Sequence, residues 1–379
     1  IFSHIFPFVQ LSDILYIINF VFFTSKTYIF YLIFFIFFII VFSFFYTKFF
    51  YFDKVKYIIL VIVLILINFI YLFFDITDSK VIFSGTIEFV SKQNTGLSDA
   101  LNENNNKMLI TNPKGVTKKI YNYMYNNKLS SDKYLLIVNE SFGKPNSEQV
   151  LNEILKPLHK INNKMEFYEQ SEISWNSATV YGELRELCRA QPKNLNLKKM
   201  TIGFEYCLPN ELKKYGYKSF SYHAALGSMY DRNIWYRKVG FNEMKFFESK
   251  NWLNHCYSFP GGCDTEFYSD IEEKLLSNDK VFVYWLTLNT HSPYDLRDLK
   301  KDVFRCEDYD IDIESQSCRS FKLQAQFFYN LAELLRKKEM AGVEVFIAGD
   351  HTPPIYSSYE KKKYFDDDKI VTLNFKIHE

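Results

Sequence analysis

The sequence predicts an α/β domain with a largely parallel central sheet, preceded by helices that cross a membrane. Beyond the first third of the chain, short β-prone apolar runs alternate with segments of helical spacing, as in strands joined by crossover helices. The first 74 residues are almost continuously apolar. The 45 Lys and Arg balance the 44 Asp and Glu, which gives no reason to expect nucleic-acid binding. The composition also excludes a disordered chain, a collagen-like chain and a simple cytosolic globule.

Two uncharged segments, residues 27–47 and 57–74, have the length of membrane spans, since a bilayer is crossed by about 20 apolar residues. A buried core helix is the alternative, which two such runs in succession disfavour. Residues 14–23 are a weaker candidate, either a third span or the remnant of one. We therefore expect residues 1–78 to form transmembrane helices. Because the chain starts at Ile1 rather than Met, we expect it to be a fragment.

Charged residues beside the predicted spans indicate their orientation. Lys48, Lys54 and Lys56 lie between the two clear spans, whereas Asp75 and Asp78 follow the second one. Positive charges mark cytoplasmic loops, so everything after the second span is expected outside the cytoplasm. Two long spans without a small-residue cleavage site exclude a cleaved signal peptide.

All six cysteines lie in the polar part of the chain and none lies in the apolar part. An even number confined to a domain outside the cytoplasm suggests disulfides in an oxidising compartment. Six free buried thiols are the alternative, and a zinc cluster is disfavoured because no C-x2-C spacing occurs. Sequential pairing would close three short loops, although the sequence leaves the connectivity open. The sequential pairs are Cys188–Cys207, Cys256–Cys263 and Cys306–Cys318.

The polar part divides into a linker and a domain. Residues 79–131 are rich in Asn and Lys and are expected to lie along the membrane surface. Residues 132–379 contain short apolar runs, typical of buried strands, and amphipathic segments typical of helices. The predicted strands are residues 133–139, 218–223, 281–289 and 343–348. The predicted helices are residues 147–161, 180–188, 211–215 and 321–338.

Polar triplets directly follow three of the predicted strands. Sites in open α/β sheets form beyond the carboxyl ends of the strands, so these triplets are candidates for a single site. Asp350 and His351 offer the oxygen and nitrogen ligands that Zn²⁺ or Mn²⁺ accepts, and Glu140 would be a third ligand. Taken alone, each could instead be a helix cap or a surface side chain. The triplets are residues 139–141, 290–292 and 349–351.

Thr179 lies in the segment WNSATVYGEL, where a helix is predicted to begin. Backbone N–H groups at a helix N-terminus can hold an anion. A metal touching the hydroxyl would lower its pKa and make it a nucleophile. The alternative is an ordinary N-cap threonine.

The order of these residues resembles that of a known family. It comprises a Glu after the first strand, a Thr at a helix start, a His after a late strand and Asp-His after the last strand. The membrane-anchored sulfatase-like transferases of the alkaline-phosphatase superfamily show this order; they include lipoteichoic acid synthases, phosphoglycerol transferases and phosphoethanolamine transferases. The resemblance covers about residues 132–375 and the preceding anchor. It implies an alkaline-phosphatase-like sandwich with a mostly parallel sheet flanked by helices.

The resemblance assigns a divalent metal, Zn or Mn, and its ligands. Thr179 in SATVYGE would be both a ligand and the nucleophile. Glu183, four positions later, matches the lipoteichoic acid synthase pattern and is expected near the substrate. The metal ligands would be Glu140 in VNESFG, Thr179, and Asp350 and His351 in AGDHTPP.

Two further segments match the same group. YHAALGSMYDRNIWYRKVGFNE resembles the segment around the phosphate head group, which suggests His223, Tyr230 and Arg232 as substrate-binding residues. Arg suits bidentate phosphate contact. LTLNTHSPYD resembles the segment whose His faces the leaving or entering oxygen, here the catalytic candidate His291. The structural alternatives are a core histidine and a helix-surface arginine.

The implied activity is transfer of a phospholipid head group, phosphoglycerol or phosphoethanolamine, through a phospho-threonine to a cell-envelope glycan or lipid acceptor. The donor lies in the bilayer, which gives the anchor a physical reason. The implied location is the bacterial cytoplasmic (inner) membrane, with the catalytic domain facing the periplasm or the cell exterior. The alternatives are a metal-dependent phosphodiester or sulfate-ester hydrolase of the same fold and a non-catalytic lipid-binding membrane protein.

Departures from the family patterns narrow the resemblance. The run ESFGKPNSE lacks the Arg and Asn that phosphoethanolamine transferases usually carry, and Thr-Pro-Pro follows Asp-His in place of Gly-Glu. Both departures favour the phosphoglycerol side. The cysteine-rich external domain, by contrast, looks Gram-negative, where either head group is possible. The C-x-P-x-R motif of formylglycine sulfatases is absent around Cys188, which disfavours sulfate-ester hydrolysis by that route.

Overall fold

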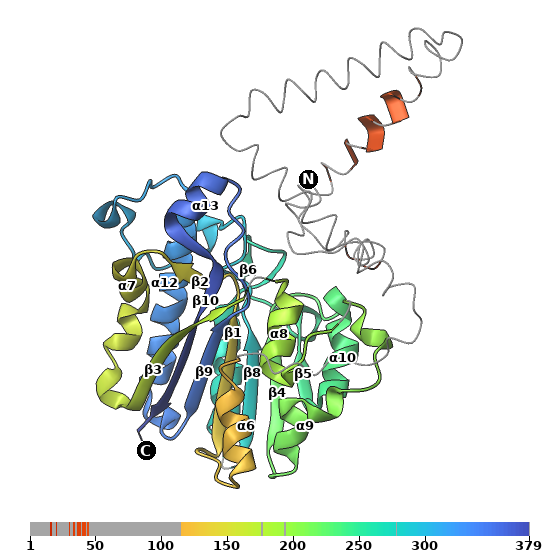
Figure 1. The fold of residues 1–379 in the computed structure, drawn as a ribbon, viewed down its shortest axis with the longest axis vertical. Helices are drawn as coiled ribbons and strands as arrows, with labels where there is room; N and C mark the ends of the chain where they lie inside the picture. Colours follow the sequence, from red (N-terminus) through yellow and green to blue (C-terminus); the bar gives the residue numbers. More distant parts are fainter. Residues whose placement is uncertain are drawn as a thin grey trace.

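The chain forms a mixed eight-stranded sheet with helices on both faces (Figure 1). The computed structural model describes residues 115–378 apart from 176, 193, 194 and 278, together with isolated positions between 16 and 44. The strand order is β2-β10-β9-β1-β8-β4-β5, and β3 pairs with β10 outside this path. Strands β9, β1, β8, β4 and β5 are parallel, whereas β10 runs antiparallel to its neighbours. The strands are β1 (Lys133–Asn139), β2 (Gly143–Pro145), β3 (Met165–Ser174), β4 (Lys218–His223), β5 (Glu243–Lys245), β8 (Val281–Leu286), β9 (Glu344–Gly349) and β10 (Phe365–Ile377).

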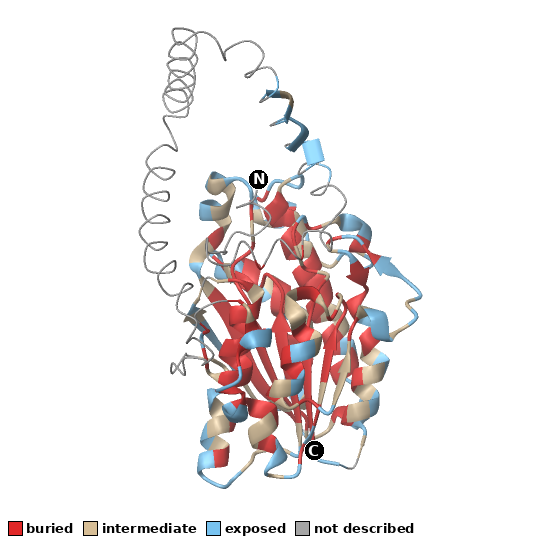
Figure 2. Cartoon of the chain, turned by 90° about the vertical axis from the view of Figure 1, so that its right-hand side faces the viewer, coloured by how far each residue is buried: buried red, intermediate tan, exposed pale blue. Residues whose placement is uncertain are grey.

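Strand β1 is apolar along almost its whole length because helices cover both of its faces. Alternate side chains of a strand point to opposite faces, so Leu135 and Ile137 enter one hydrophobic core and Leu136 and Val138 the other. Residues of α7, α11 and α12 complete the first core, and residues of α6, α8, α9 and α10 complete the second. Figure 2 shows the buried residues concentrated in the sheet and on the inner sides of the helices. The helices are α6 (Lys118–Tyr125), α7 (Glu148–His159), α8 (Thr179–Cys188), α9 (Leu208–Lys213), α10 (Arg232–Val239), α11 (Tyr268–Leu275), α12 (Gln316–Leu335) and α13 (Ser358–Tyr364).

The four predicted strands correspond to β1, β4, β8 and β9. The prediction of 281–289 is too long, because β8 ends at Leu286 and the next side chain, Thr287, bonds to Asn139 at the end of β1. Strands β3 and β10 were not predicted. β3 lies at the edge of the sheet with mostly exposed side chains, and β10 begins with a run of aspartates, so neither starts as an apolar run.

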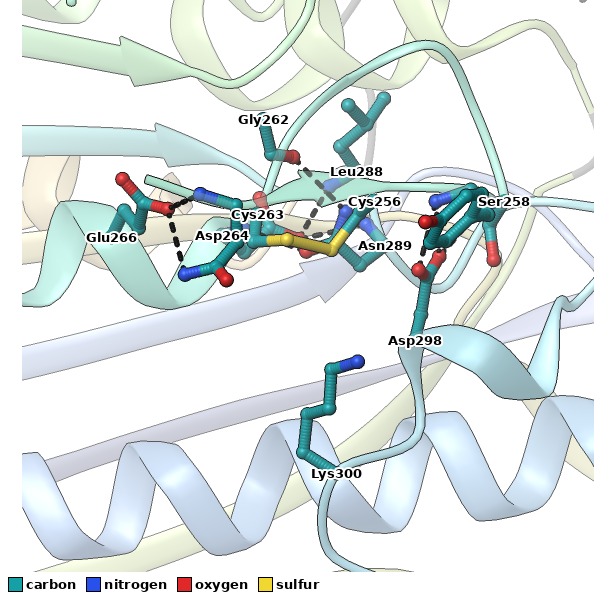
Figure 3. Close-up of a disulfide and its surroundings, with 12 residues drawn as sticks. Cys256, Ser258, Gly262, Cys263, Asp264, Glu266, Leu288, Asn289, Asp298 and Lys300 are labelled. Carbon is teal, nitrogen blue, oxygen red and sulfur yellow. Dashed lines mark hydrogen bonds between the residues drawn. A yellow bond between two sulfur atoms is a disulfide. The ribbon is translucent and has the colours of Figure 1, made fainter. Parts of the chain in front are cut away.

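The three disulfides confirm the sequential pairing. Cys188–Cys207 joins the end of α8 to the residue that caps α9, and Cys306–Cys318 ties a loop to the first turn of α12. Cys256–Cys263 closes the loop between the short strands β6 (His255–Cys256) and β7 (Gly261–Gly262), drawn in Figure 3. No described cysteine is free.

The predicted linker is described only from residue 115 onward. There α6 packs into the second core through Ile120 and Met124, and Thr117 donates its hydroxyl to the main-chain carbonyl of Glu186 at 2.8 Å. Within the described part of the chain, no helix is both long and apolar enough to cross a bilayer. The predicted spans lie outside the described residues, apart from isolated positions within 14–23 and 27–47.

Replacing both Cys188 and Cys207 with serine is expected to lower the free energy of unfolding by about 3 kcal/mol, because a cross-link over 19 residues mainly restricts the unfolded chain. Urea unfolding of the full chain in detergent, followed by tryptophan fluorescence, measures the loss. The matched variant lacking Cys256 and Cys263, only 7 residues apart, should lose about 2 kcal/mol. A larger loss for the shorter loop would contradict the loop-length argument.

Candidate functional site

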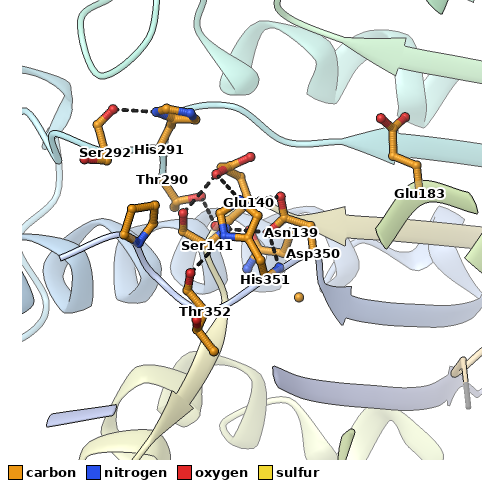
Figure 4. A network of polar contacts seen from close by, with 12 residues as sticks. Asn139, Glu140, Ser141, Glu183, Thr290, His291, Ser292, Asp350, His351 and Thr352 are labelled. Carbon is orange, nitrogen blue, oxygen red and sulfur yellow. Dashed lines mark hydrogen bonds and ion pairs between the residues drawn. The ribbon is translucent and has the colours of Figure 1, made fainter. Parts of the chain in front are cut away.

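The parallel pairing of β1 with β9 brings three potential metal ligands together. Asn139 is in register with Gly349, so the next residues, Glu140 and Asp350, leave the sheet side by side. Glu140, Asp350 and His351 are all buried, and each offers one ligand atom within 4.8 Å of the other two. Figure 4 shows these three side chains converging beyond the strand ends.

Hydrogen bonds leave His351 suited to bind a cation. Its Nδ1 is 2.9 Å from the carbonyl oxygen of Thr352, which can only accept, so Nδ1 carries the proton. The other ring nitrogen, Nε2, faces the carboxylates, 3.4 Å from Glu140 Oε1 and 3.2 Å from Asp350 Oδ2. A carbonyl that fixes the tautomer in this way is typical of metal-binding histidines.

The two carboxylates also fit a cation. Asp350 Oδ1 accepts from the backbone N–H groups of Ser141 and His351, at 2.8 and 2.7 Å, whereas the buried Oδ2 has no hydrogen-bond partner among the described residues. A buried oxygen without a partner costs free energy that a cation would recover. Burial, followed by the charge of Asp350, raises the pKa of Glu140 well above its usual value. A divalent cation would offset both effects, so these residues fit a metal.

The N-terminal turn of α8 packs against this group. The residue before the helix is Ala178, so Thr179 is the first helical residue rather than an N-cap. Gly182, one turn later, leaves room for Asp350: a Cβ at Gly182 would lie 2.9 Å from the Asp350 carbonyl oxygen and 3.0 Å from its Cα. Arg185 Nη2 donates to the carbonyl oxygen of Gly349 at 2.7 Å and holds the helix to β9. Thr179 is partly exposed at the positive end of this helix.

Glu183 and Arg232 form a buried ion pair. Arg232 donates from Nε and Nη2 to Glu183 Oε1, at 2.9 and 2.8 Å. Tyr284 donates to Glu183 Oε2 at 3.1 Å, and Tyr236 donates to the same oxygen. Burial alone would lower the pKa of Arg232, but the facing Glu183 carboxylate raises it. Both Glu183 oxygens are therefore occupied, and Figure 4 shows Glu183 apart from the three ligands. Glu183 therefore acts on the predicted site by holding Arg232 in place.

Two histidines lie beyond the adjacent strands β4 and β8. His223 ends β4 and has its Nδ1 3.0 Å from the carbonyl oxygen of Leu286. Burial, followed by the nearby charge of Arg232, lowers its pKa well below the usual value. His291 has its Nδ1 at the carbonyl oxygen of Ser292, and burial lowers its pKa to about 4. Both rings are neutral at pH 7, and Nε2 of His291 is the nitrogen available to accept a proton.

Tyr230 lies in a strained turn before α10. Tyr230 and Asp231 both have positive φ, 56° and 53°, which is unfavourable for residues other than glycine. The turn places the Tyr230 ring 5.2 Å from the Arg232 guanidinium carbon. Two residues of the N-terminal part contact the same turn. Tyr16 donates its hydroxyl to Asp231 at 2.9 Å, and the Phe20 ring lies 5.7 Å from that of Tyr230.

Further polar residues hold Glu140 in place, and of these Thr287 and Gln324 lie outside the predicted triplets. Its carbonyl oxygen accepts from Thr290 Oγ1 at 2.7 Å and from Gln324 Nε2 at 2.9 Å. Asn139 donates to Gln324 Oε1 at 2.8 Å and accepts from Thr287 Oγ1 at 3.0 Å. The signal for Gln324 is a polar residue on the buried side of α12, where only apolar residues are expected.

Three solved structures are similar over most of the described domain. A lipoteichoic acid synthase, LtaP from Listeria monocytogenes, is 18% identical with a TM-score of 0.48, and the match covers 65% of each chain. The phosphoglycerol transferase GacH of Streptococcus pyogenes, in complex with sn-glycerol-1-phosphate, is 14% identical with a TM-score of 0.47, covering 69% of this chain and 73% of GacH. The C-terminal periplasmic domain of EcEptC from Escherichia coli, in complex with Zn, is 15% identical with a TM-score of 0.45, covering 66% and 74%.

The match with LtaP spans just under two thirds of that protein's chain. Curated proteins give no sequence match. A sulfatase family model, by contrast, matches residues 132–373, which is more than half of the chain and contains every residue of the candidate site. The protein therefore belongs to the sulfatase family.

Proposed function

We propose that the protein transfers the phosphorylated head group of a membrane phospholipid to a glycan or lipid of the cell envelope, through a phosphoester on Thr179. The buried group of Glu140, Asp350 and His351 against the first turn of α8 carries this proposal. It combines cation ligands with an anion-binding helix terminus, and a phosphodiester can use both. Membership of the sulfatase family supports chemistry on an oxyacid ester.

Glu140, Asp350 and His351 would hold a divalent cation, Zn²⁺ or Mn²⁺, with the hydroxyl of Thr179 as a further ligand. The cation supplies Lewis-acid chemistry: it lowers the pKa of the hydroxyl and stabilises charge on the phosphoryl oxygens. One imidazole and two carboxylates form a ligand set that suits both metals.

The transfer proceeds in two steps at Thr179. In the first step, Thr179 Oγ attacks phosphorus as its hydroxyl proton passes to His291 Nε2, the bond to the diacylglycerol oxygen breaks, and that oxygen takes the same proton from Nε2. In the second step, the acceptor hydroxyl gives its proton to His291 Nε2, its oxygen bonds to phosphorus, the bond from phosphorus to Thr179 Oγ breaks, and Oγ takes that proton back from Nε2. Because burial lowers the pKa of His291, a proton taken up at Nε2 passes readily to an alkoxide leaving group.

Arg232 and His223 would bind the phosphoryl oxygens, and Tyr230 would border the head group. Glu183 holds the guanidinium through Nε and Nη2, so the arginine needs no reorganisation when charge develops. The departures described above favour phosphoglycerol as the head group. We place residues 1–78 in the cytoplasmic membrane and the catalytic domain outside it, because the lipid donor lies in the bilayer.

Thr179→Ala is expected to lower diacylglycerol release by at least about 1000-fold, because the proposed phosphoester forms on the Thr179 hydroxyl. The full chain, in mixed micelles with labelled phosphatidylglycerol and with phosphatidylethanolamine, provides the assay. Thr179→Ser keeps a nucleophilic oxygen and should retain measurable release. The control Ser177→Ala removes a neighbouring hydroxyl and should leave the rate unchanged. Near-normal release by Thr179→Ala would overturn the mechanism.

Asp350→Asn is expected to weaken binding of Zn²⁺ and Mn²⁺ by about 100-fold or more, since even outer-shell partners of a metal contribute about 10- to 100-fold. Equilibrium dialysis with elemental analysis measures the affinity. Asp295→Asn is the matched control, because this aspartate pairs with Arg297 and lies outside the ligand group. Equal metal content in wild type and Asp350→Asn would contradict the assignment.

Glu183→Gln is expected to lower the free energy of unfolding by about 3 kcal/mol or more, because it leaves the buried Arg232 without a charged partner. Urea unfolding of the full chain measures this loss. Glu169→Gln breaks the exposed pair with Lys119 and should cost no more than about 1 kcal/mol. Similar small losses in both variants would show that the buried Glu183–Arg232 pair stabilises the fold no more than an exposed pair does.

A further inference from the structure

The loop closed by Cys256–Cys263 is fixed to the segment that carries His291 (Figure 3). On one side, the Asp298 carboxylate accepts from the backbone N–H of Tyr257 at 2.8 and 2.9 Å and from that of Ser258 at 2.7 Å. Ser258 Oγ accepts from the N–H of Asp295 at 3.0 Å. These contacts join the loop to the residues that follow His291.

The other end of the loop is joined to the residues that precede His291. Asp264 Oδ2 accepts from the N–H groups of Leu288 and Asn289, both at 2.8 Å, and the Asp264 N–H donates to Asn289 Oδ1 at 2.6 Å. Gly262 donates its N–H to the carbonyl oxygen of Ala224 at 2.9 Å. The loop is therefore held on both sides of His291 and also to the residue after His223.

Phe259 lies in this loop, and its ring packs against the His291 ring. The centroids are 4.8 Å apart and the planes are inclined by 59°. Phe259 is half-buried and packs against both hydrophobic cores, so its own position is fixed. The His291 ring contacts the Ser292 carbonyl oxygen at Nδ1 and packs against the tilted ring of Phe259. These two contacts fix the direction of Nε2.

We infer that Phe259 is a positioning residue for His291 and that the loop closed by Cys256–Cys263 is the frame that holds it in place. The inference rests on the proposed function only for the role given to His291. A proton-transferring group must stay within hydrogen-bond reach of the reacting oxygen, and small displacements are costly in rate. The loop thus contributes to the site without supplying a metal ligand or a phosphate-binding residue.

The mobility of His291 can be measured without any turnover. Diethyl pyrocarbonate adds a carbethoxy group to neutral imidazole nitrogen and releases ethanol and carbon dioxide, and peptide mass spectrometry gives the rate at each histidine. In the full chain, Phe259→Ala should raise the rate at His291 by roughly two- to tenfold, the effect of losing one aromatic contact. Phe259→Tyr keeps the ring and should restore the wild-type rate. An unchanged rate at His291 in Phe259→Ala would overturn the inference.

Two controls separate positioning from general loosening. Phe247 packs on the exposed His255 with centroids 5.8 Å apart, so Phe247→Ala should affect His255 and leave His291 unchanged. Replacing Cys256 and Cys263 with serine should raise the His291 rate, whereas replacing Cys306 and Cys318 should not. Equal acceleration at His291 in both disulfide variants would contradict a specific frame.

Measurements of head-group transfer then distinguish this inference from the proposed function. If wild type transfers head group, Phe259→Ala should lower kcat by about tenfold or more without changing metal content, and Phe259→Tyr should restore it. Unchanged kcat in Phe259→Ala would contradict a positioning role. If wild type transfers no head group, the proposed function fails, and the modification rates alone decide whether Phe259 positions His291.

Discussion

The parallel register between β1 and β9 is the constraint on which the site depends. It places Glu140 and Asp350 side by side at buried strand ends, where two ionised carboxylates repel each other unless a cation lies between them. The raised pKa of Glu140 and the Asp350 Oδ2 that no described residue hydrogen-bonds are consequences of this placement. His351 completes the group, and a carbonyl oxygen fixes the tautomer of its imidazole. A divalent cation resolves all three features together, which makes a metal the simplest account of why they occur here.

The surroundings of this group include residues that the proposed function assigns to anion binding. The first turn of α8 packs against Asp350, and the ion pair of Glu183 with Arg232 holds a guanidinium near His223. Ligands for a cation and donors for an anion thus meet at one edge of the sheet. A phosphodiester bound there would contact both, with Thr179 at the helix start as the attacking group.

The sequence predicted the parts of the fold that are locally encoded. Buried strands such as β1 show as apolar runs, and the cysteine spacing suggested the pairing that the structure confirms. The edge strand β3 and its partner β10 escaped prediction because long-range pairing, rather than an apolar run at the start of the strand, defines them. For the site, the motifs gave residue types but not their contacts. That Glu183 has no free oxygen and that Phe259 packs on His291 depend on tertiary packing, which local sequence does not carry.

The most direct test of the account is tandem mass spectrometry of the metal-loaded full chain, quenched during turnover of phosphatidylglycerol and, separately, of phosphatidylethanolamine. The account predicts a head-group phosphoester located on Thr179 with at least one of these lipids. A phosphoester on another residue, or lipid turnover without any adduct on the protein, would contradict it.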